Sequence, residues 1–364
     1  MRTSPFRIRT EVTALSNHDA DPGAIMPQEG EWVRGASGLI RLQKKIAEGG
    51  EGIVYSASTS GKAAKIYKPG FCTSLRKEKV RLLTDKCLSC PGICFPEEIL
   101  YDLKGHFVGF LMDMAEGKSL AVTVMNPILL RKKFPDWEEQ DDVQLCRTIL
   151  EKVQYLHRMG IIMGDVNQGN ILIKDPTTVY FVDTDSYQVE DLPCPVGKDD
   201  FTAPELFADG RVDFSKTLRT MDQDNYAISI LLFEILIHGK SPYTVAGNHA
   251  AQKGTRLFPY RVDGIKTDAV PIGSWNDYWS GLPDSVREAF YSTFSSGEKH
   301  NVPGQRLTEA EWLAIFGQCP EKKAQITWLL SLLKVGFNTA VGISIGAHIC
   351  YFLRLAGYAL PAFG

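Results

Sequence analysis

The sequence lacks any long run of lysine and arginine, and its charges nearly balance. Forty basic residues stand against 43 acidic ones, which gives a formal net charge of −3. Proteins that bind nucleic acid usually present a basic patch that attracts the phosphate backbone. The composition therefore argues against nucleic acid as a partner.

The first 30 residues also lack the apolar run that a secretory signal contains. Eight cysteines are scattered along the chain, a usage that suits a reducing compartment. We therefore expect a cytoplasmic protein. Hydrophobic residues make up 44% of the chain and charged residues 23%, which is ordinary for globular proteins and argues against disorder in the bulk of the chain.

One cysteine cluster stands out from the rest. Cys87, Cys90 and Cys94 follow one another with the spacing C-x2-C-x3-C. They would hold zinc if Cys72 or another residue supplied a fourth ligand. The simpler interpretation is that these are buried thiols in the core of a lobe.

No internal repeat or low-complexity segment interrupts residues 38–318, and the chain is long enough for two lobes. Residues 1–37 are polar without a period of 2 or 3.6, so we interpret them as a tail. Short runs rich in β-branched residues then predict antiparallel strands, at 39–46, 52–57, 62–67, 98–103 and 107–112.

Helices are predicted from apolar spacing and from capping residues. Residues 73–85 form an expected exposed helix within the strand-rich part. Further helices are expected at 143–159, which Gly160 would end, and at 224–238, which is apolar nearly all round and therefore buried. A β-rich part would meet a helical part near residues 115–117.

The last stretch, 319–364, is unusually apolar. Residues 335–353 contain no charge and are long enough to span a bilayer, so residues 326–353 are a candidate membrane anchor. Gly336, Gly342 and Gly346 would equally suit a helical hairpin packed closely against the body or a partner. Both interpretations stay open.

A glycine-rich turn and a lysine suggest a phosphate site. Gly49, Gly50 and Gly52 lie between two predicted strands, where backbone N–H groups without side chains can approach phosphates. Lys65 lies within an apolar strand, where an unpaired ammonium group would be costly to bury. Its expected partners are nucleotide phosphates and Glu78 on the following helix.

Three further polar residues suggest metal-assisted chemistry. Asp165 and Asn170 follow a predicted helix, and Asp183 ends a hydrophobic strand. Mg²⁺ favours carboxylate and amide oxygens, so Asn170 and Asp183 are candidate metal ligands. Asp165 then remains as a base that orients or deprotonates a hydroxyl.

These elements, in this order, resemble the eukaryotic-type protein kinase superfamily over roughly residues 38–318, and the departures resemble a divergent bacterial group of serine/threonine kinases. The resemblance implies an α+β bilobal fold, with an N-lobe at 38–115 and a C-lobe at 116–318. It implies that Lys65, Glu78 and Asp165 are catalytic, with ATP and Mg²⁺ as cofactors. The residues implied to surround the nucleotide are Ala47, Gly49, Gly50, Gly52, Val54, Ala63, Lys65, Met112, Asp113, Met114 and Leu172.

The resemblance further implies an ion pair between Glu205, in an Ala-Pro-Glu element, and the distant Arg306. Gly164 stands where an arginine is usual, which predicts a non-RD kinase whose activity does not depend on a phosphorylated activation loop. Asn167 replaces an expected lysine, and Asp185 ends a segment that usually reads Asp-Phe-Gly.

The expected function is therefore transfer of the γ-phosphoryl group of Mg-ATP to serine or threonine of protein substrates, with a metal-dependent protein phosphatase as an implied partner. Two alternatives stay open. A small-molecule phosphotransferase of the same fold would share the loop around Asp165, and a pseudokinase scaffold would bind nucleotide without transferring phosphate.

Overall fold

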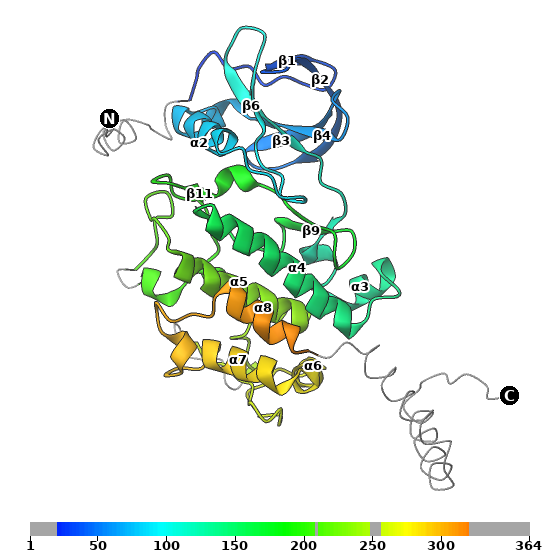
Figure 1. The fold of residues 1–364 in the computed structure, drawn as a ribbon, viewed down its shortest axis with the longest axis vertical. Helices are drawn as coiled ribbons and strands as arrows, with labels where there is room; N and C mark the ends of the chain where they lie inside the picture. The colour runs from blue at the N-terminus through cyan, green and yellow to red at the C-terminus, as the bar shows by residue number, and fades with distance from the viewer. Residues whose placement is uncertain (1–19, 208–209, 248–255, 320–364) are drawn as a thin grey trace, which may run out of the picture. The chain divides into compact units, whose positions relative to one another are not determined.

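The computed structural model describes residues 20–207, 210–247 and 256–319, in which a β-rich part precedes a helical part (Figure 1). This agrees with the predicted α+β architecture of two lobes. The order of the strands determines where the predicted site residues lie.

Six antiparallel strands form a closed barrel in the N-terminal lobe, in the order β1-β2-β3-β4-β6-β5. Alternate side chains point into the barrel, and Tyr55, Ala64 and Leu111 are among those that fill it. The strands are β1 (Trp32–Gly35), β2 (Gly38–Glu48), β3 (Gly52–Ala57), β4 (Lys62–Tyr67), β5 (Glu98–Tyr101) and β6 (Phe107–Asp113).

β1 corrects the sequence prediction, which placed its residues in a polar tail. Its Val33 is fully buried and lies opposite Ile40 of β2, while Arg34 pairs with Tyr101 of β5. A four-residue strand that buries one side chain gives too short an alternation to be recognised. The strand matters because it closes the barrel between β2 and β5.

Helix α2 (Ser74–Asp85) packs beside the barrel, close to its predicted bounds. Thr73 caps it, because the hydroxyl of Thr73 accepts a hydrogen bond from the backbone N–H of Arg76. The buried side chains of α2 are Lys79, Val80 and Leu83. A lysine therefore lies on the face that packs inward.

The C-terminal lobe is mostly helical. Its helices are α3 (Pro127–Lys133), α4 (Glu139–Arg158), α5 (Met221–Leu236), α6 (Trp275–Gly281), α7 (Asp284–Phe294) and α8 (Glu309–Gly317). Short strands flank the lobe boundary: β7 (Lys118–Ser119), β9 (Ile171–Ile173) and β10 (Val179–Phe181) form one sheet, and β8 (Ile161–Ile162) pairs with β11 (Gln188–Val189). These strands carry the loops of the site.

α4 and α5 begin earlier than the sequence predicts. A capping box between Glu138 and Asp141 starts α4 before its apolar spacing begins. α4 ends before Gly160, whose φ of 72° is the left-handed conformation expected of a helix stop. α5 is buried along most of its length, as predicted.

The cysteine cluster does not form a metal site within the described residues, where no group of three or more His, Cys, Asp or Glu side chains is placed to hold an ion. Cys87 is exposed, Cys90 half-buried and Cys94 fully buried. Burial raises the pKa of the Cys94 thiol to about 12, which suits an inert core thiol.

Among residues 20–207, 210–247 and 256–319, no helix has the length and apolar character needed to cross a bilayer. Residues 326–353, for which an anchor is predicted, lie outside the described residues.

Candidate active site

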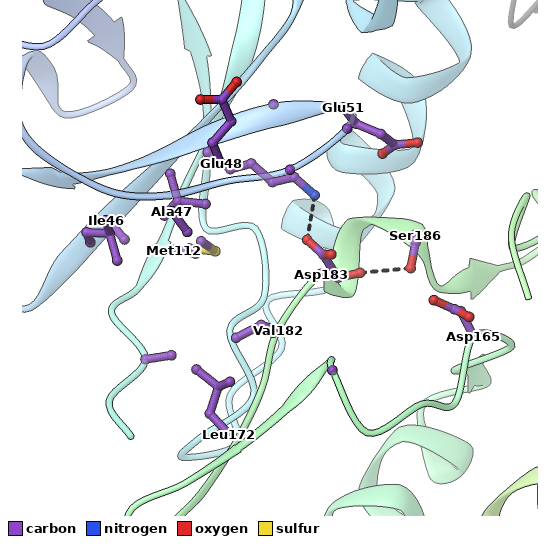
Figure 2. A pocket seen from close by; sticks show the side chains of 18 of the residues that line it. Ile46, Ala47, Glu48, Glu51, Met112, Asp165, Leu172, Val182, Asp183 and Ser186 are labelled. Carbon is purple, nitrogen blue, oxygen red and sulfur yellow. Dashed lines mark hydrogen bonds and ion pairs between the residues drawn. The ribbon is translucent and has the colours of Figure 1, made fainter. Parts of the chain in front are cut away.

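A cavity of about 540 Å³ lies between the two lobes (Figure 2). Most of the residues that are predicted to surround the nucleotide line this cavity, and they come from the part of the chain between β2 and β10. The predicted residues that line it are Ala47, Gly49, Gly50, Gly52, Val54, Ala63, Lys65, Met112, Met114, Asp165, Leu172 and Asp183. Glu78, Asp113 and Asn170 do not line it.

One end of the cavity is apolar and suits a flat ring. Val54 and Ala63 come from adjacent strands, and Ala63 lies opposite Met112 in the pairing of β4 with β6. Leu172 approaches from the C-terminal lobe (Figure 2). The sequence analysis missed Val182, which lines the same end; its position next to Asp183 on a hydrophobic strand was the available signal.

Asp113 points away from this end. Its carboxylate pairs with Lys62 at 2.7 Å, and its side chain is half exposed. The neighbouring Met114 does line the cavity, and its backbone N–H donates to the carbonyl of Gly61. Asp113 is therefore not among the residues that line the cavity, although it is predicted to be.

The glycine-rich turn between β2 and β3 covers the other end. Gly49 donates its backbone N–H to the carbonyl of Gly52 at 2.9 Å, which closes the turn. A Cβ at Gly52 would lie 2.5 Å from the carbonyl oxygen of Ile66, so only glycine fits this close approach to β4. Two carboxylates that the sequence analysis missed, Glu48 and Glu51, also line the cavity.

Lys65 is buried and has two carboxylate partners. Its Nζ lies 2.9 Å from Asp183 and 2.6 Å from Asp185. Burial lowers the pKa of Lys65, but the two carboxylates outweigh this and raise the pKa above its ordinary value. Lys65 is therefore a fixed positive charge in the wall of the cavity.

The predicted ion pair between Lys65 and Glu78 is wrong. Glu78 is paired with Arg81 on the same helix at 2.6 Å. Lys79 is one of the buried residues of α2, and a one-residue step turns a helix by about 100°, which carries Glu78 away from the inner face.

α2 instead presents cations to the site. Arg76 pairs with Glu51 at 2.6 Å and lies 3.5 Å from Asp185. Lys79 donates to the carbonyls of Ser186 and Pro193 at 2.9 and 2.7 Å, and burial lowers its pKa to about 8. The helix thus holds the segment that follows Asp183.

Asp165 lies across the cavity from Asp183 (Figure 2). Its Oδ2 accepts hydrogen bonds from the side-chain amides of Asn167 at 2.9 Å and Asn170 at 3.0 Å. Burial raises the pKa of Asp165, and the bond from Asn170 opposes this. These two amides fix the orientation of the carboxylate.

Asp224 anchors the loop that carries Asp165. Its carboxylate accepts from the backbone N–H groups of Met163 and Gly164, both at 2.9 Å. It also contacts Nε2 of His157 at 3.0 Å. Because Asp224 lies in the buried helix α5, the loop is fixed to the core of the lobe.

Asp183 and Asn170 fit a magnesium ion by their chemistry. Asp183 takes a left-handed φ of 59° at the end of β10, and its side chain is half exposed. Asn170 uses its amide nitrogen on Asp165, which leaves its oxygen as a ligand. Oxygen donors of this kind are those that Mg²⁺ prefers.

Comparison with known families agrees with this geometry. The family model described as the protein kinase domain matches residues 40–275, which is more than half of the chain. The chain belongs to the protein kinase family.

Several curated proteins are similar to this kinase. Protein kinase YegI of Escherichia coli is 28% identical over 76% of this chain and 44% of its own length. A probable serine/threonine-protein kinase, zyg-1 of Caenorhabditis briggsae, is 28% identical over 55% of this chain and 27% of its own. A protein kinase and PP2C-like domain-containing protein of Arabidopsis thaliana is 26% identical over 57% of this chain and 33% of its own. The chain thus spans less than half the length of these relatives.

The kinase contains an arginine near Asp165 that sequence reasoning missed. A Cβ at Gly164 would overlap the guanidinium of Arg219. Arg219 is buried and donates to the carbonyl of Val196 at 2.9 Å, and its guanidinium lies 4.5 Å from the ring of Phe214. The only hint in the sequence was Gly164 itself, because a glycine leaves room for another group beside the backbone.

The predicted pair of Glu205 and Arg306 is confirmed. The guanidinium of Arg306 contacts both carboxylate oxygens of Glu205, at 2.8 and 2.7 Å, and it also lies 2.5 Å from Asp222 of α5. Arg306 thus joins Glu205, at the end of the activation segment (residues 183–205), to Asp222 in the buried helix α5.

Proposed function

We propose that this chain is a serine/threonine protein kinase that transfers the γ-phosphoryl group of Mg-ATP to protein hydroxyls. The observation that carries the proposal is the convergence of Lys65, Asp165 and Asp183 on one cavity beneath a glycine-rich turn. Phosphoryl transfer is catalysed almost entirely by positioning and by charge stabilisation, and these three residues supply both.

Each residue would take a separate part of that work. Lys65 would neutralise the nucleotide phosphates, and Asp183 with Asn170 would hold magnesium, which supplies further neutralisation when it is bound. Asp165, oriented by two amides, would accept the proton of the attacking hydroxyl. The turn from Gly49 to Gly52 would cover the phosphates and exclude water.

A protein substrate is favoured over a small molecule. The bidentate pair between Glu205 and Arg306 holds the segment that forms the peptide platform in protein kinases. The preference for serine and threonine rests on the name of the Caenorhabditis relative. A pseudokinase is disfavoured because a scaffold would have no need to keep Lys65, Asp165 and Asp183 in one cavity.

We also propose that the kinase is of the non-RD type. Gly164 cannot bind a phosphate, and Arg219 beside it already bonds the carbonyl of Val196. The guanidinium is therefore engaged with the activation segment before any phosphate is added.

A metal-dependent protein phosphatase remains a proposed partner, supported by the Arabidopsis relative, whose name joins a kinase with a PP2C-like domain. The cytoplasmic setting and an anchor over residues 326–353 also remain proposals.

The test is to incubate the purified chain with γ-labelled ATP, Mg²⁺ and a protein mixture, and to identify the labelled amino acids. Asp165→Asn should lower transfer by about 10²- to 10⁴-fold while ATP binding persists. Asp268→Asn, at an exposed position away from the cavity, is the matched control. Label confined to added sugars or alcohols would favour the small-molecule enzyme, and ATP binding without any transfer would favour the pseudokinase.

A further inference from the structure

Asp185 is a buried carboxylate without a role in the mechanism above. Its side chain has no solvent exposure. It contacts Nζ of Lys65 at 2.6 Å and accepts a hydrogen bond from the hydroxyl of Tyr67 at 2.7 Å. Burying a charge of this kind is costly unless it is fully paired, so the pairing has to serve the folded state or its activity.

Asp185, and not Glu78, is the buried carboxylate that pairs with Lys65. In protein kinases the lysine that corresponds to Lys65 of β4 pairs with a carboxylate of the neighbouring helix. Here Glu78 is engaged with Arg81, and the carboxylate reaches Lys65 from the segment after Asp183 instead. Asp183 also contacts Lys65, but its half-exposed side chain is the one that faces the cavity (Figure 2).

The contacts of Asp185 continue to the glycine-rich turn. Arg76 of α2 lies 3.5 Å from Asp185, and its guanidinium stacks 4.8 Å from the ring of Tyr67. The same guanidinium nitrogen lies 2.6 Å from Glu51, which lines the cavity from that turn. Four parts of the site are thereby joined: β4, α2, the segment after β10 and the turn.

The charges in this network alternate. Negative and positive side chains contact one another in turn, in the order Glu51, Arg76, Asp185 and Lys65. Removing Asp185 would leave two buried cations, Arg76 and Lys65, close together without the negative charge that lies between them. Lys65 would then be held by Asp183 alone and could shift out of position.

We propose that Asp185 is a positioning residue that replaces the missing helix carboxylate: it holds Lys65 in place for the nucleotide phosphates and, through Arg76 and Glu51, couples that lysine to the glycine-rich turn. The inference rests on the proposed function, since it assigns Lys65 to phosphate binding. It differs from the family pattern in placing this role on the activation segment and not on the helix.

The primary test compares Asp185→Asn with Glu78→Gln, two changes that each replace a carboxylate with an amide of the same size. Asp185→Asn should weaken ATP binding by about 10- to 100-fold, the loss expected for a buried charge-assisted pair. Glu78→Gln should stay within about twofold, because its partner is an exposed arginine on the same helix. Equal effects of the two changes, or an unchanged affinity for Asp185→Asn, would overturn the proposal.

A second variant covers the case in which Asp185→Asn does not fold. Arg76→Gln keeps the contact between Lys65 and Asp185 but breaks the link to Glu51. In the nucleotide-free protein, amide hydrogen exchange at residues 48–53 should rise in Arg76→Gln and remain at the wild-type rate in Glu78→Gln. Unchanged exchange in Arg76→Gln would contradict the coupling.

These readouts separate the proposal from the proposed function. Hydrogen exchange needs no nucleotide, and ATP affinity needs no phosphoryl transfer. A chain that binds ATP through Lys65 and transfers no label would refute the kinase assignment while leaving the role of Asp185 measurable. Lys65→Met sets the scale, because its loss of ATP affinity is the largest that Asp185→Asn should approach.

Discussion

His157 is a buried histidine whose charged form the fold stabilises, and we expect it to make stability depend on pH. Its Nε2 lies 3.0 Å from Asp224 and its Nδ1 contacts Glu309 of α8. Burial lowers the pKa of His157, but hydrogen bonds and charge from the two carboxylates outweigh this and raise it to about 9. The same Asp224 anchors Met163 and Gly164, so the charge also supports the loop that carries Asp165.

The sign follows from the direction of the shift. The pKa of His157 rises from 6.5 in the unfolded chain to about 9 in the folded one. The charged form therefore stabilises the fold fully below pH 6.5, and this stabilisation is lost as the pH rises through 9. One pKa unit corresponds to about 1.4 kcal/mol, so the loss over this range is on the order of 3 kcal/mol.

The assay is urea denaturation of the wild type and His157→Gln at pH 6.5 and pH 9, the two limits of the shift. The free energy of unfolding of the wild type should fall by about 3 kcal/mol more than that of the variant between these limits. Comparing differences removes the contribution of other groups that titrate in the same range. His300→Gln, which alters a histidine outside this cluster, should follow the wild type. Parallel curves for the wild type and His157→Gln would refute the reasoning.

Three further predictions concern close packing and the activation segment. Gly109→Ala should destabilise the fold by about 1–3 kcal/mol or more in urea, because a Cβ there would overlap the carbonyl of Lys65, whereas Gly70→Ala, with open space around it, should change stability by less than about 0.5 kcal/mol. Arg219→Gln should lower kcat by about tenfold with little change in the KM for ATP, since it loses the bond to Val196. Wild-type protein freed of all phosphate should keep its activity; inactivation on dephosphorylation would contradict the non-RD proposal.

The parts of the fold that are encoded locally were predictable from the sequence. β3 and β4 have the predicted bounds, because alternating apolar residues and glycine turns define a strand within a few residues. The short spacing of Asp165 and Asn170 likewise predicts that they lie together, and the amide of Asn170 does bond the carboxylate of Asp165.

Groups that meet only through tertiary packing were not predictable in the same way. The order of elements predicts Glu78 as the partner of Lys65. The inner face of α2 instead includes Lys79, and the order of elements does not show which residue of a helix points inward. Arg219 lies far along the chain from Gly164, and no local pattern relates the two. In both cases a charged residue is buried against a partner that only the folded chain provides.

These long-range contacts have a common target, the segment that follows Asp183. Lys79 bonds the carbonyls of Ser186 and Pro193 from the N-terminal lobe, and Arg219 bonds that of Val196 from the C-terminal lobe. Asp185, at the start of the segment, is paired with Lys65. Cations thus hold this segment through backbone carbonyls, which are present whatever the modification state of the side chains. In other kinases, phosphorylation creates an anion that an arginine can bind. Here Lys79 and Arg219 are already bonded to backbone carbonyls. Lys79 alone bonds two of these carbonyls, so its removal would free both of them at once.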